Sequence, residues 1–164
     1  MGQSLGKTNV GIPSGRLHSV FALLIEGDRA VNLSDTDKDG DTALSLAVKQ
    51  GHDALVTGLL EQGVDVNVPD KNGKTPIFHA AIRGYLGIMR QLITAGAIVD
   101  KKDRDLNTPL IDAAKNGHYE IMLELIRCGA DTKHTNNTGT NPLMALCDHR
   151  RYGSKGYAKC GTIC

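Results

Sequence analysis

The chain has 164 residues and a nearly balanced charge, with 19 lysines and arginines against 18 aspartates and glutamates. This balance argues against nucleic acid or an anionic membrane as the main partner, and an aromatic content of 4% leaves few side chains that could stack on bases. Since no apolar run approaches the roughly 20 residues of a membrane span, a membrane segment is not expected.

The N-terminal segment, residues 1–16, is rich in glycine, contains Pro13 and offers little to bury, so we expect it to be flexible. Residues 17–36 contain one apolar stripe at helical spacing, formed by Val20, Phe21, Leu24 and Ile25. This stripe predicts a single helix, and we interpret 17–36 as a partial repeat that caps the N-terminal end.

A short phrase then recurs at intervals of 33 residues. It reads Thr42-Ala43-Leu44, Thr75-Pro76-Ile77, Thr108-Pro109-Leu110 and Asn141-Pro142-Leu143. Two sets of glycines keep the same period: Gly51, Gly84 and Gly117, and then Gly63, Gly96 and Gly129. A fixed period of this length is typical of a stacked repeat protein.

Each period predicts two helices. Thr75 and Thr108 can cap a first helix, in which Pro76 and Pro109 take the first position and need no amide hydrogen bond. Gly84 and Gly117 are suited to end it, and the later glycines to end the second helix. The second helices carry apolar stripes: Leu55, Val56, Leu59 and Leu60; Ile88, Met89, Leu92 and Ile93; Ile121, Met122, Leu125 and Ile126.

Polar turns rich in Asp, Asn and Gly separate the periods and predict hairpin-like loops. The sequence therefore predicts an all-α solenoid of helix-turn-helix units joined by such loops. We place repeats at 37–69, 70–102 and 103–135, followed by an incomplete repeat and tail at 136–164.

The pattern resembles the ankyrin repeat, whose motif runs D-x-x-G-x-T-P-L-H-x-A-A, then G-H, an apolar helix and G-A-D-V-N. The best matching stretches are Asp70–Asp100 and Asp103–Lys133. The resemblance implies a module that binds another protein, with no enzyme activity and no cofactor. Two alternatives stay open: the interaction segment of a larger enzyme or effector, and a regulatory module held together by zinc.

The departures from the motif lead to three expectations. The motif histidine is replaced by Ser45, Phe78, Ile111 and Met144, so its usual hydrogen bond to the neighbouring turn is not expected. Separately, His79 and Asp112 occupy equivalent positions of adjacent units, and we expect them to pair across the stack. Leu106 occupies the glycine position of its turn, so that turn should be distorted or destabilised by roughly 1 kcal/mol. The last unit lacks a second helix, so its outer face should be partly exposed, or covered by a partner or a further chain segment.

Ankyrin repeats usually bind through the hairpin tips and the concave face of the first helices, and the resemblance carries this surface over by position. An acidic and hydrophobic segment of a partner protein would suit the cations around Ile82, which we expect to be exposed. The implied contact residues are Lys38, Asp39, Asp41, Lys49, Gln50, Lys71, Asn72, Lys74, Ile82, Arg83, Arg104, Asp105, Asn107, Lys115 and Asn116.

Three weaker patterns compete with the structural interpretation. Residues 35–41 imitate the start of a calcium loop, but Leu46 stands where a bidentate Glu is required. Asn67 resembles a site of asparagine hydroxylation in some ankyrin repeats. Zinc would find its ligand types in the C-terminal region, at Cys147, His149, Cys160 and Cys164.

Cysteine usage bears on location. Four cysteines in 164 residues are too few for a disulfide scaffold, and the N-terminal segment does not read as an export signal. We therefore expect a cytoplasmic or nuclear location.

Overall fold

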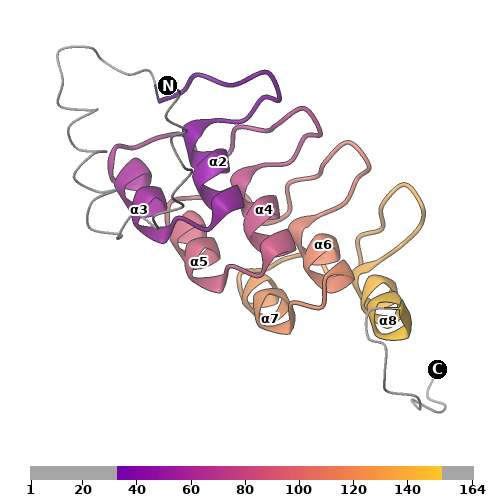
Figure 1. The fold of residues 1–164 in the computed structure, drawn as a ribbon. Coiled ribbons are helices and arrows are strands. Elements are labelled where there is room, and N and C mark those ends of the chain that lie inside the picture. The colour runs from indigo at the N-terminus through magenta and orange to yellow at the C-terminus, as the bar shows by residue number, and fades with distance from the viewer. Residues whose placement is uncertain (1–32, 153–164) are drawn as a thin grey trace, which may run out of the picture.

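The structure is a computed structural model that describes residues 33–152, with side chains as far as His149. Seven helices in this part form two rows, and the hairpins that connect the units project together on one side (Figure 1). The first helices of the units make the inner row: α2 (Ala43–Gln50), α4 (Pro76–Arg83), α6 (Pro109–Lys115) and α8 (Pro142–Tyr152). The second helices make the outer row: α3 (Asp53–Glu61), α5 (Leu86–Thr94) and α7 (Tyr119–Arg127).

The predicted all-α repeat stack is confirmed. Consecutive helices of the inner row pack against one another, and α2, α4 and α6 each pack against the outer helix of their own unit. Within 33–152 no strand forms, and the hairpins contain one isolated bridge, between Thr36 and Thr42. None of the helices in this range is long and apolar enough to cross a membrane. The predicted N-terminal segment and most of the capping repeat lie outside the described residues.

The inner helices begin where the recurring phrase predicts. Thr42 and Thr108 accept a hydrogen bond from the backbone amide three residues ahead, as an N-cap does. Thr75 takes the same backbone position, but its hydroxyl makes no capping bond and is buried without a partner, so its predicted side-chain cap is not formed. Pro76 and Pro109 occupy the first turn as expected.

Gly84 ends α4 in the left-handed conformation, with φ 81°, as predicted. The next unit uses the space that this glycine leaves open. A Cβ at Gly84 would lie 2.8 Å from Cε1 of His118, whose Nε2 is 3.0 Å from the carbonyl oxygen of Ile82. The Gly-His pair of the motif therefore joins consecutive units, because the histidine of one unit binds the helix end of the unit before it.

The core lies between the two rows of helices. Paired alanines, Ala80-Ala81 and Ala113-Ala114, are fully buried and let the helices of a unit approach closely. The outer stripes face them, with Met89, Leu92 and Leu125 completely buried. Packing is therefore continuous along the stack, as a repeat protein requires.

The C-terminal end of the stack interrupts this packing. Leu110 and Ile111 of α6 are fully buried, whereas Leu143 and Met144, at the equivalent positions of α8, are 68% and 53% exposed. The last unit contributes only α8 within the described residues, so no outer helix covers these side chains there. The expectation that the outer face of this unit is partly exposed is confirmed.

The turn at Leu106 keeps the shape of its neighbours in spite of its sequence. Leu106 has φ 58°, in the left-handed region, while Gly73 and Gly139 at the equivalent positions have φ 79° and 75°. The turn closes through a hydrogen bond from Leu106 N to Asp103 O at 3.1 Å. Of the two expected outcomes, distortion is not seen. The energetic cost stays a prediction, which the left-handed conformation of leucine supports.

Replacing Leu106 by Gly is expected to raise the free energy of unfolding by about 0.5–1 kcal/mol. The substitution relieves a left-handed penalty of about 1–2 kcal/mol and adds backbone entropy to the unfolded chain that offsets part of it. Chemical denaturation measures the change. Leu106→Ala is the control, because it removes the side chain and keeps the penalty; an equal gain in that variant would contradict the backbone explanation.

Candidate interaction surface and the ion pairs beneath it

The hairpins form one row because each is bonded to the next through its backbone. The bonds run from Lys71 N to Asp39 O at 3.0 Å, from Arg104 N to Asn72 O at 2.9 Å and from Asn137 N to Asp105 O at 3.0 Å. Backbone hydrogen bonds between neighbouring hairpins fix the hairpins relative to one another. The hairpin tips therefore present their side chains at a regular spacing.

Each hairpin is also closed from within by its first acidic or amide residue. Asp70 Oδ1 accepts the amides of Asn72 and Lys74, at 2.8 Å and 3.0 Å. Asp37 does the same for Asp39 and Asp41, and these backbone hydrogen bonds lower the pKa of Asp37. The turn itself therefore explains the carboxylate that imitated a calcium ligand.

Most of the predicted contact residues lie at the surface. The exposed set comprises Lys38, Asp39, Lys71, Asn72, Arg104 and Asp105 at the hairpin tips, and Gln50, Arg83, Lys115 and Asn116 at the ends of the inner helices. Lys49, Lys74 and Ile82 are half-buried. The hydrophobic anchor expected at Ile82 is thus only partly accessible.

Asp41 and Asn107 correct the expectation that every one of these side chains faces solvent. They are 5% and 6% exposed, because the residue before the phrase threonine turns under the hairpin. Asp41 accepts the hydroxyl of Ser45 at 2.9 Å. Asn107 Oδ1 accepts the Lys115 ammonium and the Asn136 amide, both at 2.8 Å. Asn107 thus joins two consecutive units, whereas the hydroxyl that Asp41 accepts belongs to its own unit.

Lys74 occupies the same inward position in the central unit. Its ammonium lies 3.0 Å from Asp103 Oδ2, contacts Asp112 and stands 4.9 Å above the ring of Phe78. Burial lowers the pKa of Lys74, but the hydrogen bonds that its ammonium donates to Asp112 and Asp103 outweigh burial and raise this pKa overall. The pairing predicted between His79 and Asp112 is wrong, since Asp112 is engaged by Lys74.

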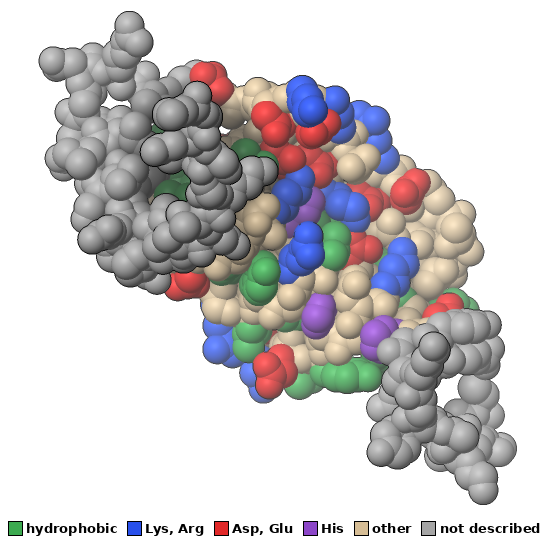
Figure 2. Space-filling view, in the orientation of Figure 1, with side chains coloured by type: hydrophobic (Ala, Val, Ile, Leu, Met, Phe, Trp, Pro, Cys, Tyr) green, Lys and Arg blue, Asp and Glu red, His purple; other side chains and the backbone are tan. Residues whose placement is uncertain are grey.

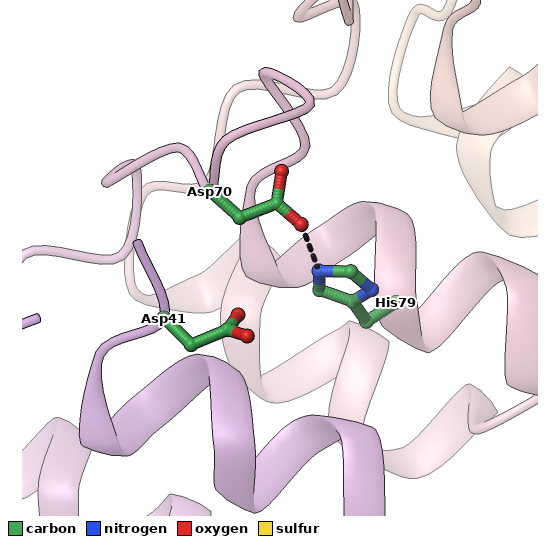
Figure 3. A group of neighbouring side chains, drawn as sticks. All are labelled: Asp41, Asp70 and His79. Carbon is green, nitrogen blue, oxygen red and sulfur yellow. Dashed lines mark ion pairs between the residues drawn. The ribbon is translucent and has the colours of Figure 1, made fainter. Parts of the chain in front are cut away.

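His79 instead faces the preceding turn, where Asp41, Asp70 and His79 meet (Figure 3). One ligand atom from each of the three lies within 4.8 Å of the others, and His79 Nε2 is 3.3 Å from Asp70 Oδ2. Lys49 supplies the positive charge here, with its ammonium 2.6 Å from Asp41 Oδ1 and 3.8 Å from Asp70 Oδ2. Burial, followed by the charge of Lys49, lowers the pKa of His79 to about 4.

The remaining candidates are the proposed zinc ligands and the proposed hydroxylation site Asn67. Cys147 is exposed and has a free thiol, His149 Nδ1 lies 2.9 Å from Lys115 O, and the other two proposed zinc ligands, Cys160 and Cys164, lie outside the described residues. Asn67 donates to Gly96 O at 3.1 Å and accepts from Ile98 N at 2.9 Å, so its amide joins two consecutive units.

The comparisons with known proteins agree with this architecture. A family model described as "Ankyrin repeats (3 copies)" matches residues 12–103, 51–136 and 87–154. The chain belongs to the ankyrin-repeat family. Ankyrin repeats are generally modules for protein–protein interaction. The comparison with curated proteins gave no match.

One exposed residue of this ankyrin-repeat surface was not among the predicted contacts. Leu106 is 42% exposed at a hairpin tip, two residues from Arg104. Because leucine stands where the motif has glycine, the sequence predicted an unusual turn here. It did not predict that the leucine side chain is accessible. Non-glycine residues held at positive φ are concentrated at functional sites, so the strained backbone at Leu106 makes this residue a candidate for the interaction surface.

Proposed function

We propose that this ankyrin-repeat protein is a non-catalytic adaptor or scaffold that binds a partner protein along the row of hairpin tips and the adjoining ends of the inner helices. The observation that carries the proposal is the bonded row itself. Three inter-hairpin backbone bonds hold the tips in register, so that a partner meets a surface ordered before binding.

The chemistry of this row suits an acidic partner segment that also carries an apolar side chain. Lys71 and Arg104 are exposed on neighbouring tips, and Leu106 stands beside the second of them. Lys and Arg side chains are spread among acidic ones over the hairpin side of the molecule (Figure 2). Cations around an apolar anchor favour a complementary acidic and hydrophobic sequence. Leu106 fills the role of anchor better than the half-buried Ile82.

A capture experiment with charge-reversed protein tests this surface. The double variant Lys71→Glu, Arg104→Glu is expected to reduce recovery of proteins captured by the wild type about tenfold, which corresponds to roughly 1.4 kcal/mol. Recovery by the wild type should also fall as salt is raised, because exposed charges are screened. Mass spectrometry of the captured material measures both effects.

A matched variant controls for net charge. Arg127→Glu with Lys133→Glu reverses two exposed cations outside the hairpin row and should leave capture unchanged. Equal losses in the two double variants would show that net charge, and not the hairpin tips, determines binding.

We further propose a cytoplasmic or nuclear location for this interaction, on the basis of the low cysteine content.

A further inference from the structure

The buried group formed by Asp41, Asp70 and His79 has features that the interaction function does not use. Its members come from two consecutive hairpins and from α4, and they are 5%, 9% and 8% exposed. One ligand atom from each lies within 4.8 Å of the others, and the Asp70 carboxylate is directed at the His79 ring (Figure 3). Buried polar groups are normally satisfied by hydrogen bonds, so an exception calls for an explanation.

His79 is that exception. Its Nε2 points into the group, but it has no hydrogen-bond partner, because its contact with Asp70 at 3.3 Å lacks hydrogen-bonding geometry. The charges are also unequal: Lys49 places one ammonium against the two carboxylates of Asp41 and Asp70. A neutral imidazole beside two carboxylates and a single monovalent cation leaves one negative charge uncompensated.

We propose that Asp41, Asp70 and His79 bind a divalent cation of the zinc type, which takes the place of the Lys49 ammonium. A divalent ion balances both carboxylates and gives Nε2 of His79 the partner that it lacks. One nitrogen and two carboxylate ligands suit zinc, whereas calcium and magnesium prefer sites made of oxygen alone.

The distances are compatible with this assignment. Ligand atoms around a tetrahedral zinc lie about 3.4 Å apart, and Asp70 Oδ2 and His79 Nε2 already lie 3.3 Å apart. Asp41 completes the set within 4.8 Å. The Lys49 side chain is 27% exposed at the end of α2, so the ammonium has a route to solvent when the ion enters.

The next unit provides an internal comparison. The residues 33 positions further along the chain are Lys74, Asp103 and Asp112, so a lysine of the group itself replaces the first carboxylate. Its ammonium binds both remaining carboxylates, and no histidine is present. The Lys115 ammonium lies a further 3.9 Å from Asp112 Oδ1, so this second group has two ammonium groups for its two carboxylates. It also lacks a nitrogen ligand, and it is therefore not expected to bind metal.

Titration of the metal-free 164-residue chain with Co²⁺ and with Zn²⁺ tests the proposal. One equivalent should bind, with the visible absorption of tetrahedral cobalt and a higher melting temperature in zinc. Lys49→Met removes the competing ammonium and should raise the affinity at least about tenfold, whereas His79→Asn should lower it by a similar factor. Circular dichroism of the metal-free variants establishes that they are folded.

The outcomes separate this site from the cysteines of the C-terminal region. Intense near-ultraviolet absorption of cobalt bound to thiolate would overturn the proposal in favour of the alternative ligands Cys147, His149, Cys160 and Cys164. A metal affinity that is unchanged in His79→Asn would also overturn it. Absence of stoichiometric binding in both wild type and Lys49→Met would overturn it as well. Asp112→Ala, at the comparison group, should leave metal affinity unchanged.

Discussion

Replacing Leu110 by Ala is expected to lower the free energy of unfolding by about 3 kcal/mol, whereas the same change at Leu143 should lower it by less than about 0.5 kcal/mol. The two leucines occupy the same position of the recurring phrase, one period apart. Leu110 is completely buried between the helix rows, and Leu143 is 68% exposed. The difference in cost therefore isolates burial from residue type and local helix position.

Urea denaturation of the two single variants measures these costs under the same conditions. Alanine is a good helix former, so local propensity contributes little to either change. A cost above about 2 kcal/mol for Leu143→Ala would show that another part of the protein, or a second molecule, covers this face in solution. A small cost at both positions would contradict the continuous core.

The fold could be predicted because its determinants are local and repeated. Thr, Pro and Gly at fixed offsets specify where each helix begins and ends, and the apolar stripes specify which face is buried. The repeated geometry extends to Leu106, where the turn has the same left-handed backbone as the other turns although the sequence lacks glycine there. Hydrogen bonds to the adjacent units maintain it, including one between His134 Nε2 and Leu106 O at 2.8 Å.

The interaction surface was predicted less completely, because the period gives a residue's position but not the direction of its side chain. Asp41, Lys74 and Asn107 are equivalent by sequence and look like ordinary polar residues of a hairpin. All three turn inward toward partners in their own or the next unit, a contact that depends on how the units stack. For the same reason Lys74, and not His79, is the residue that reaches Asp112.

Lys74→Met is expected to lower the free energy of unfolding by about 2–3 kcal/mol. Removing one partner of a buried ion pair costs about 3–5 kcal/mol, because the remaining charge stays buried without compensation. The Lys74 side chain is 20% exposed, which places the expected value at or below the lower end of that range. Methionine replaces the ammonium above the Phe78 ring by a favourable sulfur–aromatic contact, so the loss reports mainly on Asp103 and Asp112.

Two matched variants test this interpretation. Lys71→Met removes an ion pair whose side chains are 61% and 60% exposed, and should change stability by less than about 0.5 kcal/mol. The triple variant Lys74→Asn, Asp103→Asn, Asp112→Ala copies the residues found one period later. It should cost less than Lys74→Met alone, since no buried charge is left unpaired. A larger cost for the triple variant would contradict the argument.

The pH dependence of stability provides a second test of the ion pairs that Lys74 makes with Asp103 and Asp112. Burial raises the pKa of Asp103, but hydrogen bonds from Lys74 and Asn107 outweigh it and lower this pKa below 3.8. The unfolded chain thus takes up the proton first as the pH falls, so this stabilisation is present above pH 3.8 and is lost below it. The raised pKa of Lys74 acts at the other end: its stabilisation is present below pH 10.5 and is lost as the pH rises past the folded-state value. The stability difference between wild type and Lys74→Met should therefore be greatest near neutral pH and shrink toward both extremes, and a difference independent of pH would identify lost packing as its cause.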